Sequence, residues 1–394
     1  MVEKETNMKK ILFVNDEMCM GGVARVLNTL MESLDKSKYE IDLLVLHPHG
    51  ELMDEIPEGV TILKSHSFFS VVDMSIGMAI KNRNIKVLLH KLYLVFLLKT
   101  GLIHNKIKKI RSKILETEYD VEFAAKEGFC TIFTAAGKAK RKINWVLVDY
   151  EEFNYSKRHM KLLRKSLEKI ELNIANSQKA ARAFQQVFGV DNVKSIHTLM
   201  DEKKVKEGIK MPLSQKIQSK DIPNVVTVGR FHHQKGMERL IKASIAVHNL
   251  GIYHQLLLIG SGELESQLKE LAREYKHIEF LGIQKNPYNW IHVSDLFVLP
   301  SYYEGFATIV TESLIAGTPV LATEVAGIQE QLTQEEYGRI VENTQEAITK
   351  GLQELLMDRD YLRTCKMKLN TYQYPNAKIL KEYEKEFDYD EEVK

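Results

Sequence analysis

Glu304 and Glu312 have seven residues between them in the stretch Leu299–Thr323, and both are placed where they could meet a ligand. The stretch predicts a strand that ends at Leu299, a loop that holds Glu304, a helix over Ile309–Ala316 and a second strand over Val320–Thr323. Open α/β sheets bind ligands at the carboxyl ends of their strands, and the start of a helix offers free N–H groups to a phosphate. Glu312 could therefore accept hydrogen bonds from a ribose, and Glu304 from a second sugar.

Two cations follow an earlier predicted strand, Asn224–Val228. Arg230 and Lys235 stand in the loop TVGRFHHQKG, where like charges repel each other unless an anion lies beside them. A diphosphate supplies that anion, because arginine offers a planar fork of donors and lysine a point charge. His232 and His233 in the same loop are adjacent and point apart, so we expect no metal site there.

Glycines stand at the ends of two further predicted strands. The run GSGELE, with Gly260 and Gly262, follows the strand Gln255–Ile259 but lacks the third glycine of a dinucleotide-binding fingerprint. Gly21 and Gly22 follow the first predicted strand. Glycine has no Cβ to block a phosphate from the backbone, although a turn also accounts for such a pair.

These segments resemble the motifs of a known family. PSYYEGF and ESLIAGTPVLAT, which hold Glu304 and Glu312, resemble the Glu-x7-Glu element of retaining glycosyltransferases of family 4 (glycosyltransferase group 1), which have the GT-B fold. The loop with Arg230 and Lys235 is similar to the GR-x4-KG element that holds the donor diphosphate in that family. The resemblance implies hexose transfer, with retained configuration, from a nucleotide diphosphate sugar to a lipid-linked glycan hydroxyl in capsule or exopolysaccharide synthesis. No Asp-x-Asp element is evident in a suitable loop, so the transfer is expected to be metal-independent.

The resemblance also implies which residues act. Its catalytic candidates are Glu304, Arg230, Lys235 and Asp149, it favours a UDP-sugar as co-substrate, and it requires no cofactor. Thr308 is expected to cap the helix that follows Glu304. Donor contacts are implied at Gly22, Gly229, Arg230, Lys235, Gly262, Ile283, Glu304, Gly305, Phe306, Ala307, Thr308, Ile309 and Glu312.

The segment KINWVLVDYEEFNY departs from the family. The capsule-type enzymes that this segment resembles carry the motif W-x-H-x-D-Y here, with the histidine near the reacting carbon. This chain has Leu147 at the position of that histidine. Leucine neither titrates nor donates a hydrogen bond, so Asp149 or Tyr150 could take that role, the acceptor geometry could differ, or activity could be reduced. Upstream, Glu127 and Gly128 resemble the family's EG turn in the acceptor cleft. A non-catalytic partner subunit and a nucleotide-sugar epimerase stay open as alternatives.

The length, composition and order of predicted elements indicate how the chain is organised. A length of 394 residues, with strands and helices in alternation, predicts two Rossmann-like, doubly wound domains that face a cleft, over 1–200 and 201–371. By resemblance, a last helix over 372–390 crosses back to the first domain. A net charge of +2 argues against a nucleic-acid partner. The charged start and three scattered cysteines predict a reducing compartment and no secretory signal.

A basic stretch over 81–113 holds ten lysines and arginines, and no acid stands between Asp73 and Glu116. Apolar residues interleave with these cations, and a second basic run covers 157–165. Such a helix suits an anionic membrane surface, or it packs on the sheet as a solvated helix. The membrane reading predicts peripheral contact at the inner face of the plasma membrane. It predicts that five apolar side chains enter the headgroup region: Leu92, Leu94, Val95, Phe96 and Leu98. It also predicts that four cations are attracted to anionic lipid: Lys106, Lys108, Lys109 and Arg111.

Overall fold

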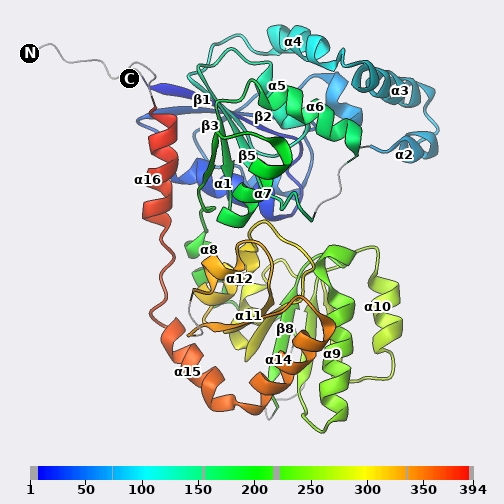
Figure 1. Cartoon of the computed structure of the whole chain (residues 1–394), viewed down its shortest axis with the longest axis vertical. Coiled ribbons are helices and arrows are strands. Elements are labelled where there is room, and N and C mark those ends of the chain that lie inside the picture. The colour runs from blue at the N-terminus through cyan, green and yellow to red at the C-terminus, as the bar shows by residue number, and fades with distance from the viewer. Residues whose placement is uncertain (1–7, 73, 153–155, 216–221, 334–335, 390–394) are drawn as a thin grey trace, which may run out of the picture. The chain divides into compact units, whose positions relative to one another are not determined.

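The computed structural model describes residues 8–72, 74–152, 156–215, 222–333 and 336–389 (Figure 1). Contacts between residues divide the chain into two compact units. Unit 1 comprises Met1–Leu199 and Asn376–Lys394, and unit 2 comprises Met200–Pro375. Each unit contains one parallel sheet with helices, so the expectation of two doubly wound α/β units is confirmed.

The sheet described in unit 1 has seven strands in the order β3-β2-β1-β4-β5-β6-β7, all paired in parallel. The strands are β1 (Lys9–Asn15), β2 (Tyr39–Val45), β3 (Val60–Ile62), β4 (Val121–Ala124), β5 (Arg141–Val146), β6 (Leu172–Ala175) and β7 (Val193–Ser195). The helices are α1 (Gly22–Ser33), α2 (Ile76–Lys81), α3 (Ile85–Thr100), α4 (Ile103–Ile114), α5 (Phe129–Ala135), α6 (Lys157–Leu167), α7 (Gln178–Phe188) and α16 (Asn376–Phe387), with the 3-10 turns η1 (Glu51–Glu55) and η2 (Ser67–Val71).

Alternation along β1 sends side chains to both faces of this sheet. Leu12 and Val14 pack in the cluster that includes residues of α3, α4 and α5. Phe13 meets Phe387 of α16 edge to face, at 6.2 Å between ring centroids. A second contact ties α16 to the same unit, because the indole N–H of Trp145 donates to the Tyr383 hydroxyl at 3.0 Å.

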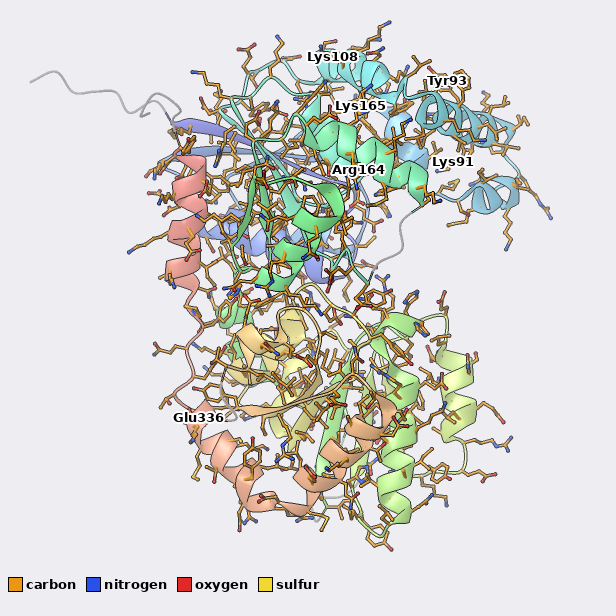
Figure 2. The ribbon with its side chains drawn as sticks, in the orientation of Figure 1. Lys91, Tyr93, Lys108, Arg164, Lys165 and Glu336 are labelled. Atoms are coloured by element: carbon orange, nitrogen blue, oxygen red, sulfur yellow. The ribbon has the colours of Figure 1, made fainter. Side chains whose placement is uncertain are left out.

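The basic stretch forms α3 and α4, and the structure divides its residues between core and solvent. Leu94 is fully buried, so its predicted headgroup contact is wrong; Leu92, Tyr93 and Phe96 stay exposed. Figure 2 labels Lys91 and Tyr93 on α3 and Lys108 on α4. The large exposed apolar side chains here are Ile85, Leu89, Leu92, Tyr93, Phe96 and Leu102.

Two cations of the basic stretch serve the fold. Lys91 is buried and donates to the carbonyl oxygens of Val71 and Val72 at 2.9 and 3.1 Å. Arg111 is buried and donates to both carboxylate oxygens of Glu122, at 2.7 and 2.8 Å. The prediction that Arg111 faces the membrane as one of the attracting cations is therefore wrong. None of the described helices is by itself long and apolar enough to cross a bilayer; α3 and α4 pass that test of length and composition only as a pair bent by 119°.

The sheet described in unit 2 has six parallel strands in the order β10-β9-β8-β11-β12-β13. Its strands are β8 (Asn224–Val228), β9 (Gln255–Ile259), β10 (Ile278–Gly282), β11 (Leu296–Leu299), β12 (Val320–Thr323) and β13 (Gly338–Val341). Its helices are α8 (Glu202–Gly208), α9 (Met237–Asn249), α10 (Glu265–Ala272), α11 (Tyr288–Val293), α12 (Thr308–Ile315), α13 (Ile328–Gln331), α14 (Gln345–Met357) and α15 (Arg359–Leu369), with the 3-10 turn η3 (His233–Lys235).

Candidate functional site

Four neighbouring strands of unit 2, β10, β9, β8 and β11, end at one edge of the sheet because they are parallel. Backbone hydrogen bonds join the loops that follow them. Gly229 N–H donates to Ile259 at 3.0 Å, and Gly260 N–H to Gly282 at 2.9 Å. Tyr302 N–H donates to Gln234 at 2.8 Å, which joins the loops after β8 and β11. The predicted site loops are therefore neighbours on one edge.

Close approach of these loops requires glycine at two positions. Gly236 has φ +62°, and a Cβ there would lie 2.0 Å from the carbonyl oxygen of Pro300. A Cβ on Gly262 would lie 2.4 Å from the carbonyl oxygen of Phe231. Both distances are far below any real contact, so a side chain at either position would push the loops apart.

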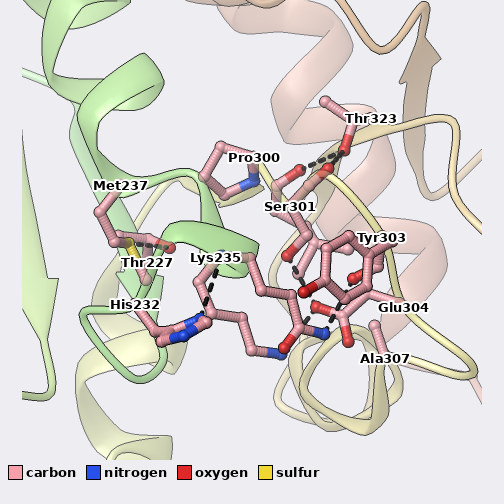
Figure 3. A network of polar contacts seen from close by, with 12 residues as sticks. Thr227, His232, Lys235, Met237, Pro300, Ser301, Tyr303, Glu304, Ala307 and Thr323 are labelled. Atoms are coloured by element: carbon pink, nitrogen blue, oxygen red, sulfur yellow. Dashed lines mark hydrogen bonds and ion pairs between the residues drawn. The ribbon is translucent and has the colours of Figure 1, made fainter. Parts of the chain in front are cut away.

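Lys235 and Glu304 meet at the centre of this edge (Figure 3). The Lys235 ammonium donates to Glu304 Oε1 at 2.7 Å, and the Ser301 hydroxyl donates to the same oxygen at 2.7 Å. Ser301 is fully buried, and its carbonyl oxygen accepts from the Thr323 hydroxyl at 2.6 Å. The carboxylate is thus held in place from β8, β11 and β12. Sequence reasoning placed Ser301 in the motif around Glu304 but gave its side chain no role.

Arg230 is exposed and, within the described ranges, makes no ion pair, so its guanidinium can meet a ligand. His233 stacks on Tyr302, with 4.6 Å between ring centroids. His232 Nε2 lies 3.5 Å from Glu263, a carboxylate that sequence spacing did not associate with it. In the part of the chain that the structure describes, the one group of three possible metal ligands lies elsewhere, in unit 1.

The start of α12 lies beside Glu304. The helix begins at Thr308, and Ala307 occupies the N-cap position without a side-chain hydrogen bond, so the prediction that Thr308 caps it is wrong. Because no side chain caps the helix, a ligand oxygen can accept from the first N–H groups, at Thr308 and Ile309. Glu312 is 7% exposed in the same helix.

The other predicted donor contacts differ in what they can offer. Phe306 is buried, as is Ala307, whose carbonyl oxygen also accepts from the Gln331 amide at 2.8 Å. These two positions can therefore present backbone but little side chain. Gly305 precedes them in the loop. Ile283, after β10, is 64% exposed.

Gly22 and Asp149 belong to unit 1, whereas the other catalytic and donor-binding candidates belong to unit 2. Gly22 is the first residue of α1. Asp149 is 1% exposed, and its Oδ2 lies 3.7 Å from Lys179 Nζ. Tyr150 packs against the ring of Phe184 at 5.2 Å in an apolar cluster. Its ring is core, which argues against Tyr150 in the histidine's place.

Glu127 is a buried polar group that the fold brings to the backbone of Leu147, the residue that stands where the family has its histidine. Its Oε1 accepts from the backbone N–H of Leu147 at 2.7 Å, although 20 residues separate the two. Burial of the carboxyl raises its pKa to about 7. The sequence had marked Glu127 only as part of a turn, because nothing local to it indicates the contact with Leu147.

Two family models together match most of the chain. The model described as "Glycosyltransferase Family 4" matches residues 20–204, and the one described as "Glycosyl transferases group 1" matches residues 210–373. The boundary between the two matches falls close to the boundary between unit 1 and unit 2. The relatives and solved structures below agree with these matches.

A Haemophilus influenzae protein named as an uncharacterized glycosyltransferase is 26% identical over 70% of this chain and 78% of its own length. The lipopolysaccharide core biosynthesis glycosyltransferase LpsE of Rhizobium meliloti is 31% identical over 36% of this chain and 42% of its own. A Campylobacter jejuni N-acetylgalactosaminyltransferase, named for a diphospho-undecaprenol substrate, is 28% identical over 37% and 41%.

Solved structures share the fold. Anabaena HepE, solved with UDP and glucose, has a TM-score of 0.66 at 16% identity and covers 96% of this chain and 98% of its own. TarM has a TM-score of 0.71 at 13% identity and covers 97% and 99%. At these identities the likeness shows the architecture alone.

Proposed function

The chain belongs to the glycosyltransferases of group 1, and from that premise we propose that it moves a hexose from a nucleotide diphosphate sugar, with UDP as the favoured nucleotide, to a hydroxyl of a lipid-linked glycan. The transfer retains the anomeric configuration and uses no metal ion. In the reaction the bond from the sugar carbon to the diphosphate breaks, and a bond to the acceptor oxygen forms on the same face. The acceptor proton passes to the departing phosphate oxygen.

The observation that carries this proposal is the pair of Lys235 and Glu304, with Arg230 and the start of α12 at the same sheet edge. An ammonium has three donors, and one goes to Glu304, so two are left for a diphosphate. Negative charge grows on the diphosphate as it leaves, and fixed cations and N–H groups stabilise that charge without rearrangement. Glu304 then faces hydroxyls of the transferred sugar, and Glu312 those of the ribose.

The lipid-linked acceptor and peripheral contact with the inner face of the plasma membrane are supported by α3 and α4. Exposed Leu92, Tyr93 and Phe96 of α3 and the exposed cations Lys108 and Lys109 of α4 belong to one stretch without an acid, and Lys106 of α4 lies 5.7 Å from the centroid of the Tyr93 ring. Apolar burial and attraction to anionic lipid both favour a membrane surface, and only the attraction is screened by salt. The Campylobacter relative's named substrate, a polyprenyl diphosphate glycan, supports the same class of acceptor.

The donor is tested by a screen of nucleotide sugars for thermal stabilisation and donor hydrolysis, with and without EDTA. A donor at 100 times its dissociation constant should raise the free energy of unfolding by about 2.7 kcal/mol. NMR of the product should show the anomeric configuration of the donor. An inverted product would overturn retention, loss of activity in EDTA would overturn metal independence, and a free sugar with altered stereochemistry would indicate an epimerase.

Membrane contact is tested by sedimentation with vesicles. The protein should pellet with anionic vesicles at low salt and less with neutral ones. Changing exposed Lys108, Lys109 and Lys113 to glutamine should weaken binding by about 1 kcal/mol per charge. The matched control changes three exposed lysines of unit 2 (Lys242, Lys269 and Lys350) and should not weaken it. Wild-type protein that ignores anionic vesicles would overturn the proposed contact.

A further inference from the structure

Three side chains of unit 1 with atoms that can bind a metal ion meet beyond the carboxyl ends of β1 and β2. They are Glu17 and Cys19, which follow β1, and His49, which follows β2. The three ligand atoms, one from each residue, all lie within 4.8 Å of one another. The proposed transfer gives none of these side chains a role.

The backbone holds the two loops together. The Met18 N–H donates to the His49 carbonyl oxygen at 2.9 Å. Gly50 has φ +115°, and a Cβ there would lie 2.2 Å from the carbonyl carbon of Met18, so only glycine permits this approach. The Asn15 side-chain amide donates to the Glu17 carbonyl oxygen at 2.7 Å. The backbone on both sides of the group is therefore fixed before any ligand binds.

The imidazole of His49 has the orientation of a metal ligand. Its Nδ1 lies 2.9 Å from the carbonyl oxygen of His47, and a carbonyl only accepts, so Nδ1 carries a proton. In the neutral ring Nε2 then has a free lone pair, and this atom lies 3.4 Å from Glu17 Oε2. Metal-binding histidines donate their other ring N–H to a carbonyl or carboxylate in the same way. A proton on Nε2 pairs His49 with Glu17 directly, whereas a metal ion makes both atoms ligands.

The set of one sulfur, one nitrogen and one oxygen ligand suits Zn²⁺. This ion binds sulfur at about 2.3 Å and nitrogen or oxygen at about 2.0–2.2 Å, in a tetrahedron whose ligand atoms are about 3.3–3.8 Å apart. The 3.4 Å between His49 Nε2 and Glu17 Oε2 fits this spacing, and rotation of the side chains closes separations of up to 4.8 Å. Mg²⁺ and Ca²⁺ prefer sets of oxygen ligands. The Glu17 carboxylate and the Cys19 thiolate each carry one negative charge, and together they balance Zn²⁺.

Negative charge in the two loops favours a cation at this place. The Met20 N–H donates to the Glu51 carboxylate at 2.9 Å, which holds a second carboxylate at the same pair of loops. Burial, together with nearby Glu17 and Glu51, raises the pKa of the Cys19 thiol. A metal ion therefore displaces the thiol proton, which passes to the solvent as the bond between sulfur and metal forms.

We propose that Glu17, Cys19 and His49 bind one Zn²⁺ ion through the carboxylate, Sγ and Nε2, with a water molecule in the fourth position of the tetrahedron. The ion joins the loop after β1 to the loop after β2. Cys19 stands two residues before Gly21, the N-cap position of α1, so the ion also restrains the start of that helix. The site contains none of the donor candidates, and the proposed transfer requires no ion in it.

The test uses the untagged full-length protein, kept reduced and freed of metal with EDTA and dialysis, without a sugar donor. It therefore does not depend on transfer. Titration calorimetry with Zn²⁺ should show one site, and Mg²⁺ should not bind there. Co²⁺ should give the near-ultraviolet absorption band of a bond between cobalt and a thiolate. Equal binding of Mg²⁺, or Co²⁺ binding without that band, would overturn the site.

Variants of the ligands locate the site. Cys19→Ser should weaken Zn²⁺ binding about 100-fold and remove the cobalt band, since loss of even an outer partner of a metal ligand costs about 10–100-fold. Glu17→Gln should weaken Zn²⁺ about tenfold. Glu58→Gln, at an exposed glutamate of the same unit, is the matched control and should leave the affinity unchanged. Wild-type affinity in Cys19→Ser, or an equal loss in the two glutamine variants, would overturn the proposal.

The wild-type protein supplies a test that holds even if a variant does not fold. Cys130 and Cys365 are buried, whereas Cys19 is partly exposed. Iodoacetamide should therefore modify Cys19 first, and an equimolar amount of Zn²⁺ should slow that reaction at least tenfold, as measured by mass spectrometry of the peptides. An unchanged rate of modification at Cys19 would overturn the site.

Discussion

The carboxyl edges of the two sheets carry opposite chemistry on the same kind of scaffold. In unit 2, backbone hydrogen bonds join four loops, and the edge presents Arg230, Lys235 and the start of α12. In unit 1, the turns after β4 and β5 bring a buried carboxyl, Glu127, to the backbone of Leu147. The difference indicates that parallel strand order supplies an edge in each unit, and that the residues after each strand decide whether this edge presents exposed cations or a buried carboxyl.

A single substitution should destabilise unit 1 and leave unit 2 unchanged. Arg111→Gln leaves Glu122 buried and unpaired, so the free energy of unfolding of unit 1 should fall by about 3–5 kcal/mol. The chain's two tryptophans, Trp145 in unit 1 and Trp290 in unit 2, report on each unit in urea titrations. Exposed Lys113→Gln is the control and should change stability by less than about 0.5 kcal/mol. A similar small loss in Arg111→Gln would contradict a structural role.

Acid should weaken unit 2 through a buried histidine cluster. His277 stacks on His248 at 3.8 Å, and burial together with the neighbouring His248 and His254 lowers its pKa to about 4. The unfolded chain therefore binds a proton that the folded unit does not, and stability falls as pH drops from about 6.5 to about 4, by up to about 3 kcal/mol. Urea titrations of Trp290 fluorescence across this range measure it. In His277→Gln, the free energy of unfolding should change less with pH. An unchanged pH dependence would contradict its origin in His277.

Unit 1 should respond to pH with the opposite sign. The pKa of Glu127 is raised from 4.5 to about 7, so the folded unit holds a proton that the unfolded chain releases. Stability from this group is full below about pH 4.5 and is lost as pH rises through 7, by up to about 3 kcal/mol. Glu127→Gln keeps the acceptor for Leu147 N–H and should remove that loss in titrations of Trp145 fluorescence. Greater instability of Glu127→Gln than wild type at pH 8 would contradict the assignment.

Removing either cation of the unit 2 edge should weaken donor binding with the fold intact. Arg230→Ala and Lys235→Ala each lose a charge-assisted contact worth about 1.5–3 kcal/mol. Titration calorimetry with UDP and turnover with the identified donor measure the loss. Lys242→Ala, an exposed lysine of α9, is the matched control. Unchanged kinetics in both site variants would remove the diphosphate assignment.

The smallest expected effect separates the two glutamates. Glu312→Ala should weaken free UDP about tenfold, because its proposed partner is the ribose. Glu304→Ala should spare free UDP and reduce transfer, because its proposed partner is the sugar. Titrating both variants with UDP decides between the roles. An equal loss of UDP affinity in the two variants would contradict the assignment of the ribose to Glu312 and the sugar to Glu304.

Local pattern sufficed for the elements that form the unit 2 edge. Three strands were predicted with the observed bounds: Asn224–Val228, Gln255–Ile259 and Val320–Thr323. Each is a largely apolar run with residues typical of turns on either side. The strands β7 and β13 were missed because they are short and partly exposed. The helix α8 was missed because its residues lie in a polar stretch that reads as a linker.

Most of the strands, the family and the candidate loops could be predicted from the sequence, because backbone preference, burial pattern and motif spacing are local properties. Tertiary structure decided which side chains meet. Lys235 reaches Glu304 across 69 residues, and Arg111 reaches Glu122 instead of solvent, through strand order and helix rotation. Leu94 and Leu92 stand two positions apart on one helix, yet one is core and the other surface, because only the packed sheet selects the face that is buried.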